Sequence, residues 1–418
     1  MSRSRLLAAV AGFLAAGQVV AGLFAAAPAA EAPTVVLDMD TVRHRPGEMK
    51  DKDGQAVPVG TIEAVEGKVG KACRFTFREG AQSGFMTLWV NATPDWDQAE
   101  ALSFWVKGDG SSSWGGLELI DGDDYALRYG YCFPIDSTEW TKVVMPWRDL
   151  IPELAGPLVD PKGGYAPSKF RNIWFGKWFY WREYPAHAYA IDQVALEKGI
   201  DLDRADYTPE RPGAARTLAR LKAKQPVTIV TMGDSLSDKR HWANRQVLWS
   251  ELLVKRLKET YGGEVTLVNP AMGGTTLTQN LIVMPRWLKD TPRPDLVTVW
   301  LGFNDWDSGV RGERFKEYLR LAVDRIRRMT KGAADVLLVT TCPAHDRWDT
   351  GKDLEEAARA VAAEKKTALA DVAAAFHQVA TPAEALQQGY WVDDKVHLGK
   401  KGHEVAADVV MKAIASGQ

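Results

Sequence analysis

The stretch VTIVTMGDSLSD, residues 227–238, joins two kinds of local sequence. Its first half is a run of β-branched and other apolar residues, which is typical of a buried strand. Gly233, Asp234 and Ser235 then interrupt the run with residue types that favour turns. This local chemistry already explains Ser235 as a turn residue, so a role as nucleophile has to be argued from the rest of the chain.

The chain after Pro226 alternates between strand and helix patterns. Apolar runs typical of strands follow at 265–269, 295–302 and 334–343, and helical periodicity is found at 246–261, 312–332, 353–366 and 399–416. Such alternation builds a parallel sheet with helices on both faces. Binding sites in these sheets lie beyond the carboxyl ends of the strands, which is where Ser235 falls.

Four segments near predicted strand ends supply complementary chemistry: GDSL (233–236), NPAMGGTT (269–276), GFND (302–305) and DKVH (394–397). A serine hydroxyl needs a base, and the base needs a third group that fixes its tautomer. Asp394 and His397 are three residues apart, so within a tight turn the carboxylate reaches Nδ1 of the imidazole while Nε2 faces outward. Attack on an ester creates an oxyanion, which requires preorganised donors.

These blocks, in this order, resemble the SGNH hydrolases, also called GDSL esterases and lipases. The resemblance implies a flavodoxin-like α/β/α three-layer domain, ester hydrolysis through a covalent acyl-enzyme, and no cofactor or metal for catalysis. It also implies that Ser235 is the nucleophile, His397 the base and Asp394 its orienting acid. The N–H group of Gly274 and the side-chain amide of Asn304 are the expected oxyanion donors, beside the N–H group of the nucleophile.

The resemblance covers roughly residues 226–416, and it leaves some assignments open. Gly273 is the alternative to Gly274 as the donor, and Asp393 adjoins the predicted acid. Ser237 stands where a GxSxG nucleophile elbow would have its second glycine, which disfavours a lipase of the α/β-hydrolase type.

Residues 33–200 consist of short alternating segments separated by turn residues, which predicts an antiparallel β-sandwich. The segments VVLDMD (35–40), LSFWVKGDG (102–110) and YAIDQVALE (189–197) resemble those of carbohydrate-binding sandwiches of the jelly-roll or galactose-binding-like kind. The polar residues 201–225 are interpreted as a linker to the hydrolase domain at 226–418.

Exposed tryptophans suit saccharide binding because their faces pack on sugar rings. The aromatic run at 174–184 makes Trp178 and Trp181 candidates for substrate binding, with core packing as the alternative. Trp306, next to the GFND block, is the candidate in the hydrolase domain.

Asp38, Asp40 and Asp192 would form a structural Ca²⁺ site if the first and last strands of the sandwich pair, since this ion prefers carboxylate oxygens. Solvated carboxylates are the alternative interpretation.

Residues 1–30 combine a basic start, a long uncharged apolar run and small residues at the end, which predicts a cleaved signal peptide and a secreted or periplasmic protein. An uncleaved membrane anchor is the alternative. Of the three cysteines, Cys73 and Cys132 are able to pair in an oxidising compartment, with Cys342 left over. The net charge of −2 gives no general attraction for nucleic acid or an anionic membrane surface.

The sequence therefore predicts a secreted two-domain serine esterase acting on an acylated polysaccharide, most simply by O-deacetylation. One alternative is a lipase, lysophospholipase or thioesterase, which needs an apolar acyl groove near Trp306 and residues 282–284. Another is a catalytically degenerate glycan-binding protein. The sandwich either binds sugar or only shapes the active site, and the sequence does not decide the oligomeric state.

Overall fold

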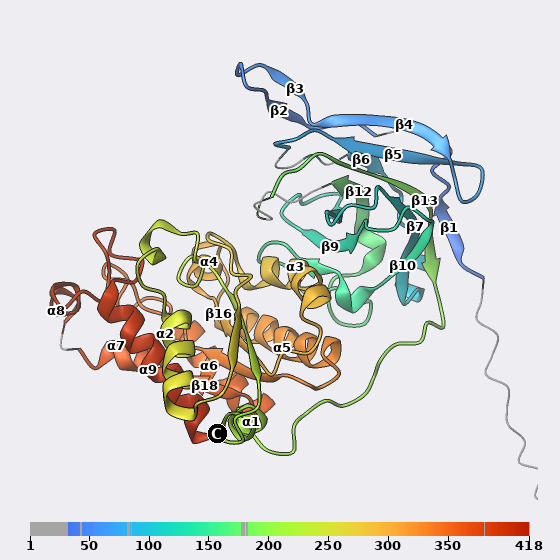
Figure 1. Ribbon diagram of the computed structural model, residues 1–418. Coiled ribbons are helices and arrows are strands. Elements are labelled where there is room, and N and C mark those ends of the chain that lie inside the picture. Colours follow the sequence, from blue (N-terminus) through green and yellow to red (C-terminus); the bar gives the residue numbers. More distant parts are fainter. Residues whose placement is uncertain are drawn as a thin grey trace, which may run out of the picture.

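The chain folds into an N-terminal β-sandwich and a C-terminal α/β domain (Figure 1). The computed structural model describes residues 32–41, 44–81, 84, 86–176, 180, 183–379 and 381–417. The predicted signal peptide, residues 1–30, lies outside the described residues. No helix within the described ranges has the length and apolar character that a membrane span requires.

The N-terminal domain contains two antiparallel sheets, as predicted. The first has the order β10-β7-β13-β5-β4, with β1 also paired to β13; its strands are β1 (Thr34–Leu37), β4 (Gly60–Glu66), β5 (Lys71–Phe77), β7 (Ala101–Gly108), β10 (Thr141–Pro146) and β13 (His187–Glu197). The second has the order β11-β9-β8-β12-β6; its strands are β6 (Met86–Trp89), β8 (Trp114–Asp121), β9 (Arg128–Pro134), β11 (Ile151–Pro152) and β12 (Phe170–Gly176). Strands β2 (Glu48–Lys50) and β3 (Ala56–Pro58) form a separate hairpin.

Alternation of side chains along these strands places aromatic rings between the two sheets. Phe75 from the first sheet stacks on Phe175 from the second, with ring centroids 5.7 Å apart. Phe104 and Phe133 meet edge to face at 5.0 Å in the same buried cluster.

The C-terminal domain is built on a parallel sheet of order β15-β14-β16-β17-β18, which is the flavodoxin-like order. Its strands are β14 (Val227–Gly233), β15 (Val265–Val268), β16 (Leu296–Trp300), β17 (Asp335–Val339) and β18 (Ala368–Ala370). Its helices are α1 (Ala215–Lys222), α2 (Trp249–Tyr261), α3 (Leu277–Asp290), α4 (Phe303–Asp307), α5 (Gly312–Met329), α6 (Lys352–Lys365), α7 (Val372–His377), α8 (Pro382–Gln387) and α9 (Lys400–Ser416). Helices α3, α5 and α6 pack on one face, and α1, α2, α7 and α9 on the other.

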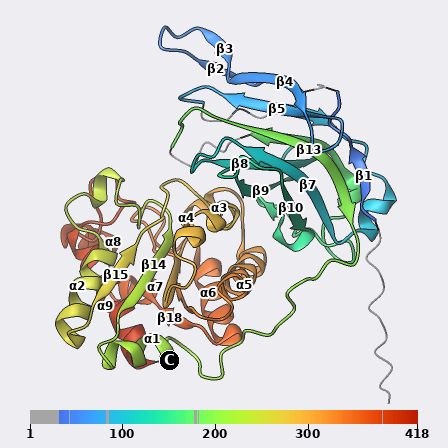
Figure 2. The same cartoon turned by 45° about the vertical axis from the view of Figure 1, so that its right-hand side comes forward.

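Two segments differ from the sequence interpretation. Helix α1 was included in the predicted linker, but it belongs to the α/β domain: Leu221 is buried in that core, and Thr217 bonds to Asp335. The connection between the domains is the extended segment 198–214 (Figure 2). Helix α3 was not predicted: it contains Pro285, and polar Gln279 and Asn280 are buried in it together with the apolar side chains.

The second sheet of the sandwich lies against α3 and α5 (Figures 1 and 2). One apolar cluster contains Trp114 and Ile151 of the sandwich together with Ile282 of α3. The hydroxyl of Tyr318 in α5 donates to the carbonyl of Gly156 at 2.6 Å. The sandwich is therefore docked on the α/β domain through a continuous core.

Charged groups complete this interface. The guanidinium groups of Arg325 and Arg328 in α5 both bond to the carboxylate of Asp149. The side chain of Arg325 is only 2% exposed, so its buried positive charge needs the carboxylate of Asp149 to compensate it.

Cys73 and Cys132 do not form the disulfide that the sequence allowed. All three are buried and reduced. Cys73 lies in the first sheet, where its thiol contacts the carbonyl of Met39, whereas the thiol of Cys132 points out of the second sheet and donates to the carbonyl of Ile282 at 3.0 Å.

Candidate active site

Ser235, His397 and Asp394 form a continuous hydrogen-bonded chain. Ser235 Oγ lies 2.9 Å from His397 Nε2, and His397 Nδ1 lies 2.6 Å from Asp394 Oδ2. Because the carboxylate can only accept, Nδ1 carries the ring hydrogen and Nε2 is left to accept the serine proton. The structure thus brings together three residues that are up to 162 positions apart.

The turn at 392–397 fixes the carboxylate of Asp394. Its Oδ1 accepts the backbone N–H groups of Val396 and His397, each at 2.9 Å, which leaves Oδ2 for the imidazole. Burial alone would raise the pKa of Asp394, but these N–H donors and the His397 ring outweigh burial and hold the pKa below its usual range. The acid therefore stays ionised beside the base throughout the neutral pH range.

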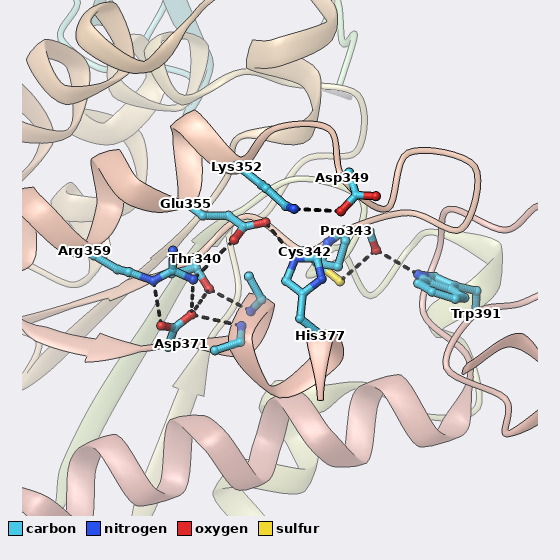
Figure 3. A network of polar contacts seen from close by, with 12 residues as sticks. Thr340, Cys342, Pro343, Asp349, Lys352, Glu355, Arg359, Asp371, His377 and Trp391 are labelled. Atoms are coloured by element: carbon cyan, nitrogen blue, oxygen red, sulfur yellow. Dashed lines mark hydrogen bonds and ion pairs between the residues drawn. The ribbon is translucent and has the colours of Figure 1, made fainter. Parts of the chain in front are cut away.

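The catalytic turn is anchored to the end of β17. Trp391, just before the turn, donates its indole N–H to the carbonyl of Pro343 at 3.1 Å, as Figure 3 shows. The isolated bridge between Trp391 and Leu398 closes the base of the turn. Behind it lies a network of hydrogen bonds and ion pairs among Thr340, Glu355, Arg359, Asp371 and His377 (Figure 3).

Two backbone N–H groups are available for an oxyanion. Those of Ser235 and Gly274 make no hydrogen bond to any described residue. Gly274 has φ +78°, a conformation that favours glycine, and the space beside its Cα is open. The N–H of Gly273 instead donates to Asp238 Oδ2 at 3.0 Å. The structure therefore favours Gly274 over Gly273 as the donor.

Asn304 is held in place by two acceptors. Its amide nitrogen donates to the carbonyl of Thr275 at 3.0 Å and contacts Asp234 Oδ2 at 3.3 Å. The amide has two hydrogens and both have a partner here, so donation to an oxyanion requires the longer contact to Asp234 to be given up. Burial raises the pKa of Asp234 to about 7.

A second buried carboxyl links the neighbouring loop. Asp305 accepts the N–H of Leu277 at the start of α3, at 3.0 Å. Burial and the adjacent charge of Asp234 raise the pKa of Asp305 to about 7. The loops after β14, β15 and β16 are thus tied together beneath the nucleophile.

Sequence reasoning missed Trp242 and left a substrate contact of His241 open; the structure places both beside His397. The ring of His241 stacks on that of His397, with centroids 4.0 Å apart and planes at 26°. Trp242 lies edge to face with His397 at 6.2 Å and is 53% exposed. The available signal was their position directly after the loop that follows Ser235.

Of the three predicted substrate-binding tryptophans, the structure describes Trp306, which is not an open platform. The ring of Trp306 is partly buried and has the guanidinium groups of Arg311 and Arg347 over it, at 4.5 and 5.2 Å. Trp178 and Trp181 lie outside the described residues.

The structure does not assemble the predicted calcium site. Within the described ranges, no group of three or more His, Cys, Asp or Glu residues is placed to hold a metal ion. The carboxylates bind backbone N–H groups instead: Asp38 that of Asp40, Asp40 that of Lys71, and Asp192 that of Val69. Only the contact between Asp38 and Asp40 lies within one turn, and Oδ1 of Asp192 is buried without a hydrogen-bond partner among the described residues.

The segment proposed for an acyl groove is also occupied. Ile282, Val283 and Met284 are at most 4% exposed and belong to the cluster that the sandwich covers. These side chains are therefore used for packing rather than for binding a chain at the surface.

Comparisons with known proteins agree with this geometry at the family level. Residues 231–405 match the model of the GDSL-like lipase/acylhydrolase family, which confirms the resemblance inferred from the motifs. Residues 48–177 match the model named complex I intermediate-associated protein 30. A search of curated proteins found no match.

Several solved structures are similar to part of this chain. A lipase/acylhydrolase from Enterococcus faecalis is 23% identical, over 46% of this chain and 96% of its own, with a TM-score of 0.37. A family 11 carbohydrate-binding module from Clostridium thermocellum is 16% identical, over 41% and 98%, with a TM-score of 0.32. A two-domain esterase described as active on acetylated mannans is 18% identical, over 50% and 54%, with a TM-score of 0.39.

Proposed function

Because residues 231–405 form a domain of the GDSL-like lipase/acylhydrolase family, we propose that this protein is an exported serine esterase that removes acetyl groups from a polysaccharide. The observation that carries ester hydrolysis is the 2.9 Å contact between Ser235 Oγ and a His397 ring whose other nitrogen is bound by Asp394.

The geometry accounts for each step of the reaction. His397 Nε2 takes the proton of Ser235 as its oxygen attacks the ester carbonyl, and the oxyanion is stabilised by the N–H groups of Ser235 and Gly274. His397 then gives the proton to the departing sugar hydroxyl, which leaves an acyl group on Ser235. Water activated by the same imidazole releases the acid and restores the serine.

Two features support a short acyl group over a long chain. The apolar side chains at 282–284 are buried under the sandwich. Within the described part of the α/β domain, Trp242 is the one large apolar side chain classed as exposed. A long acyl chain would need a continuous apolar groove to leave water, since its binding depends on buried apolar area.

The test measures acetate released from acetylated mannan and acetylated xylan, and fatty acid released from long-chain esters. We expect acetate release by the intact protein and its loss in Ser235→Ala. Ser308→Ala is the matched control, because it removes an exposed hydroxyl after α4 and should leave the rate unchanged.

Other outcomes point to the alternatives. Fatty acid release without acetate release would show a lipase or thioesterase that uses the same serine. Binding of glycans without hydrolysis of any ester would favour the degenerate glycan-binding protein. Export is tested separately by measuring the mass of the protein after secretion, which should lack about the first 30 residues.

A further inference from the structure

Trp242 lies next to the base that protonates the alcohol part of the ester. During acylation, the leaving oxygen receives its proton from His397 Nε2, so the group attached to that oxygen lies on the His397 side of the nucleophile. The Trp242 ring lies edge to face with the His397 ring, with centroids 6.2 Å apart.

The turn that carries Trp242 is anchored by hydrogen bonds. Trp242 begins a single 3₁₀ turn, Trp242–Asn244, whose last residue is completely buried. The Asn244 amide donates to the carbonyls of Ser235 and Asp238, at 2.7 and 2.8 Å. The turn is therefore tied directly to the loop of the nucleophile.

A second ring contacts both Trp242 and the base. The His241 ring lies 5.5 Å from that of Trp242 and 4.0 Å from that of His397. The indole nitrogen of Trp242 makes no hydrogen bond with any described residue, so it is available as a donor.

We infer that Trp242 is the platform on which the sugar ring bearing the ester stacks; this inference rests on the proposed function. A pyranose has an apolar face of C–H groups that packs on an indole, while its hydroxyls remain in water. A flat ring that is half exposed and lies beside the base suits this ligand. A flexible acyl chain would gain little from it, because one face cannot enclose the chain.

The test compares Trp242→Ala, Trp242→Leu and Trp242→Phe on two substrates. One is an acetylated oligosaccharide of mannan or xylan, and the other is ethyl acetate, whose alcohol has no ring. We expect Trp242→Ala to lower kcat/KM for the oligosaccharide at least about tenfold more than for ethyl acetate, mainly through KM. Trp242→Phe should recover most of the loss and Trp242→Leu little, since only Phe keeps a flat face.

Tyr125→Ala is the control, since Tyr125 is equally exposed at 53% but lies on the sandwich. Equal losses on both substrates, equal activity of the Leu and Phe variants, or a matching loss in Tyr125→Ala would overturn the inference. A wild-type protein that hydrolyses ethyl acetate but no acetylated glycan would overturn the proposed function instead, and the inference with it.

Discussion

Replacing Asp394 by Asn should remove the general base without disturbing the turn. Asp394 Oδ1 accepts two backbone N–H groups at 2.9 Å, so the oxygen of an Asn side chain will keep that position. Its NH₂ group then faces His397 Nδ1. Because NH₂ donates, Nδ1 has to accept, and the ring hydrogen moves to Nε2, which can no longer take the proton of Ser235.

The size of the effect follows from this change of tautomer. We expect kcat to fall by about 10⁴, or roughly 5.5 kcal/mol in the activation free energy, with KM little changed. The assay is steady-state hydrolysis of ethyl acetate, with a thermal melt of each variant. Asp393→Asn is the matched control because that exposed neighbour makes no hydrogen bond to His397. A loss below about 100-fold, or an equal loss in the control, would refute the reasoning.

Three further predictions concern the oxyanion site, the interface and the buried acid. Asn304→Ala should lower kcat by about 10²–10³, as measured by steady-state kinetics, whereas Asn280→Ala, in the adjacent helix, should not. Asp149→Ala leaves the Arg325 guanidinium buried without its carboxylate, so urea unfolding should show a loss of about 3–5 kcal/mol; a loss below 1 kcal/mol would contradict this. Burial raises the pKa of Asp234 to about 7, above its value in the unfolded chain, so stability is fully present below about pH 4 and should fall as the pH rises towards 7, by about 1.4 kcal/mol per pH unit. Unfolding at pH 5 and 7 should show a shallower fall in Asp234→Asn; an identical pH dependence would rule this out.

Most of the fold class and of the candidate site could be predicted from local sequence patterns. The strands of the sandwich and the alternation after Pro226 follow from side-chain periodicity, which depends on near neighbours. Strand β18 escaped prediction because three residues are too few for a pattern. Helix α3 escaped prediction because Pro285 is unfavourable inside a helix, and because polar Gln279 and Asn280 are buried there.

The sequence by itself determined the chemistry of Ser235, Asp394 and His397. A three-residue spacing sets the contact between acid and base within one turn, and parallel strands bring their carboxyl ends to one edge of the sheet. Only the tertiary structure decided which of the other candidate residues are buried and which are exposed, because that depends on contacts between segments distant in the chain. Docking of the sandwich buries the segment at 282–284, while Trp242 stays exposed beside the base. Burial and exposure of this kind depend on which surfaces pack together in the fold, and a short-range sequence pattern does not predict that.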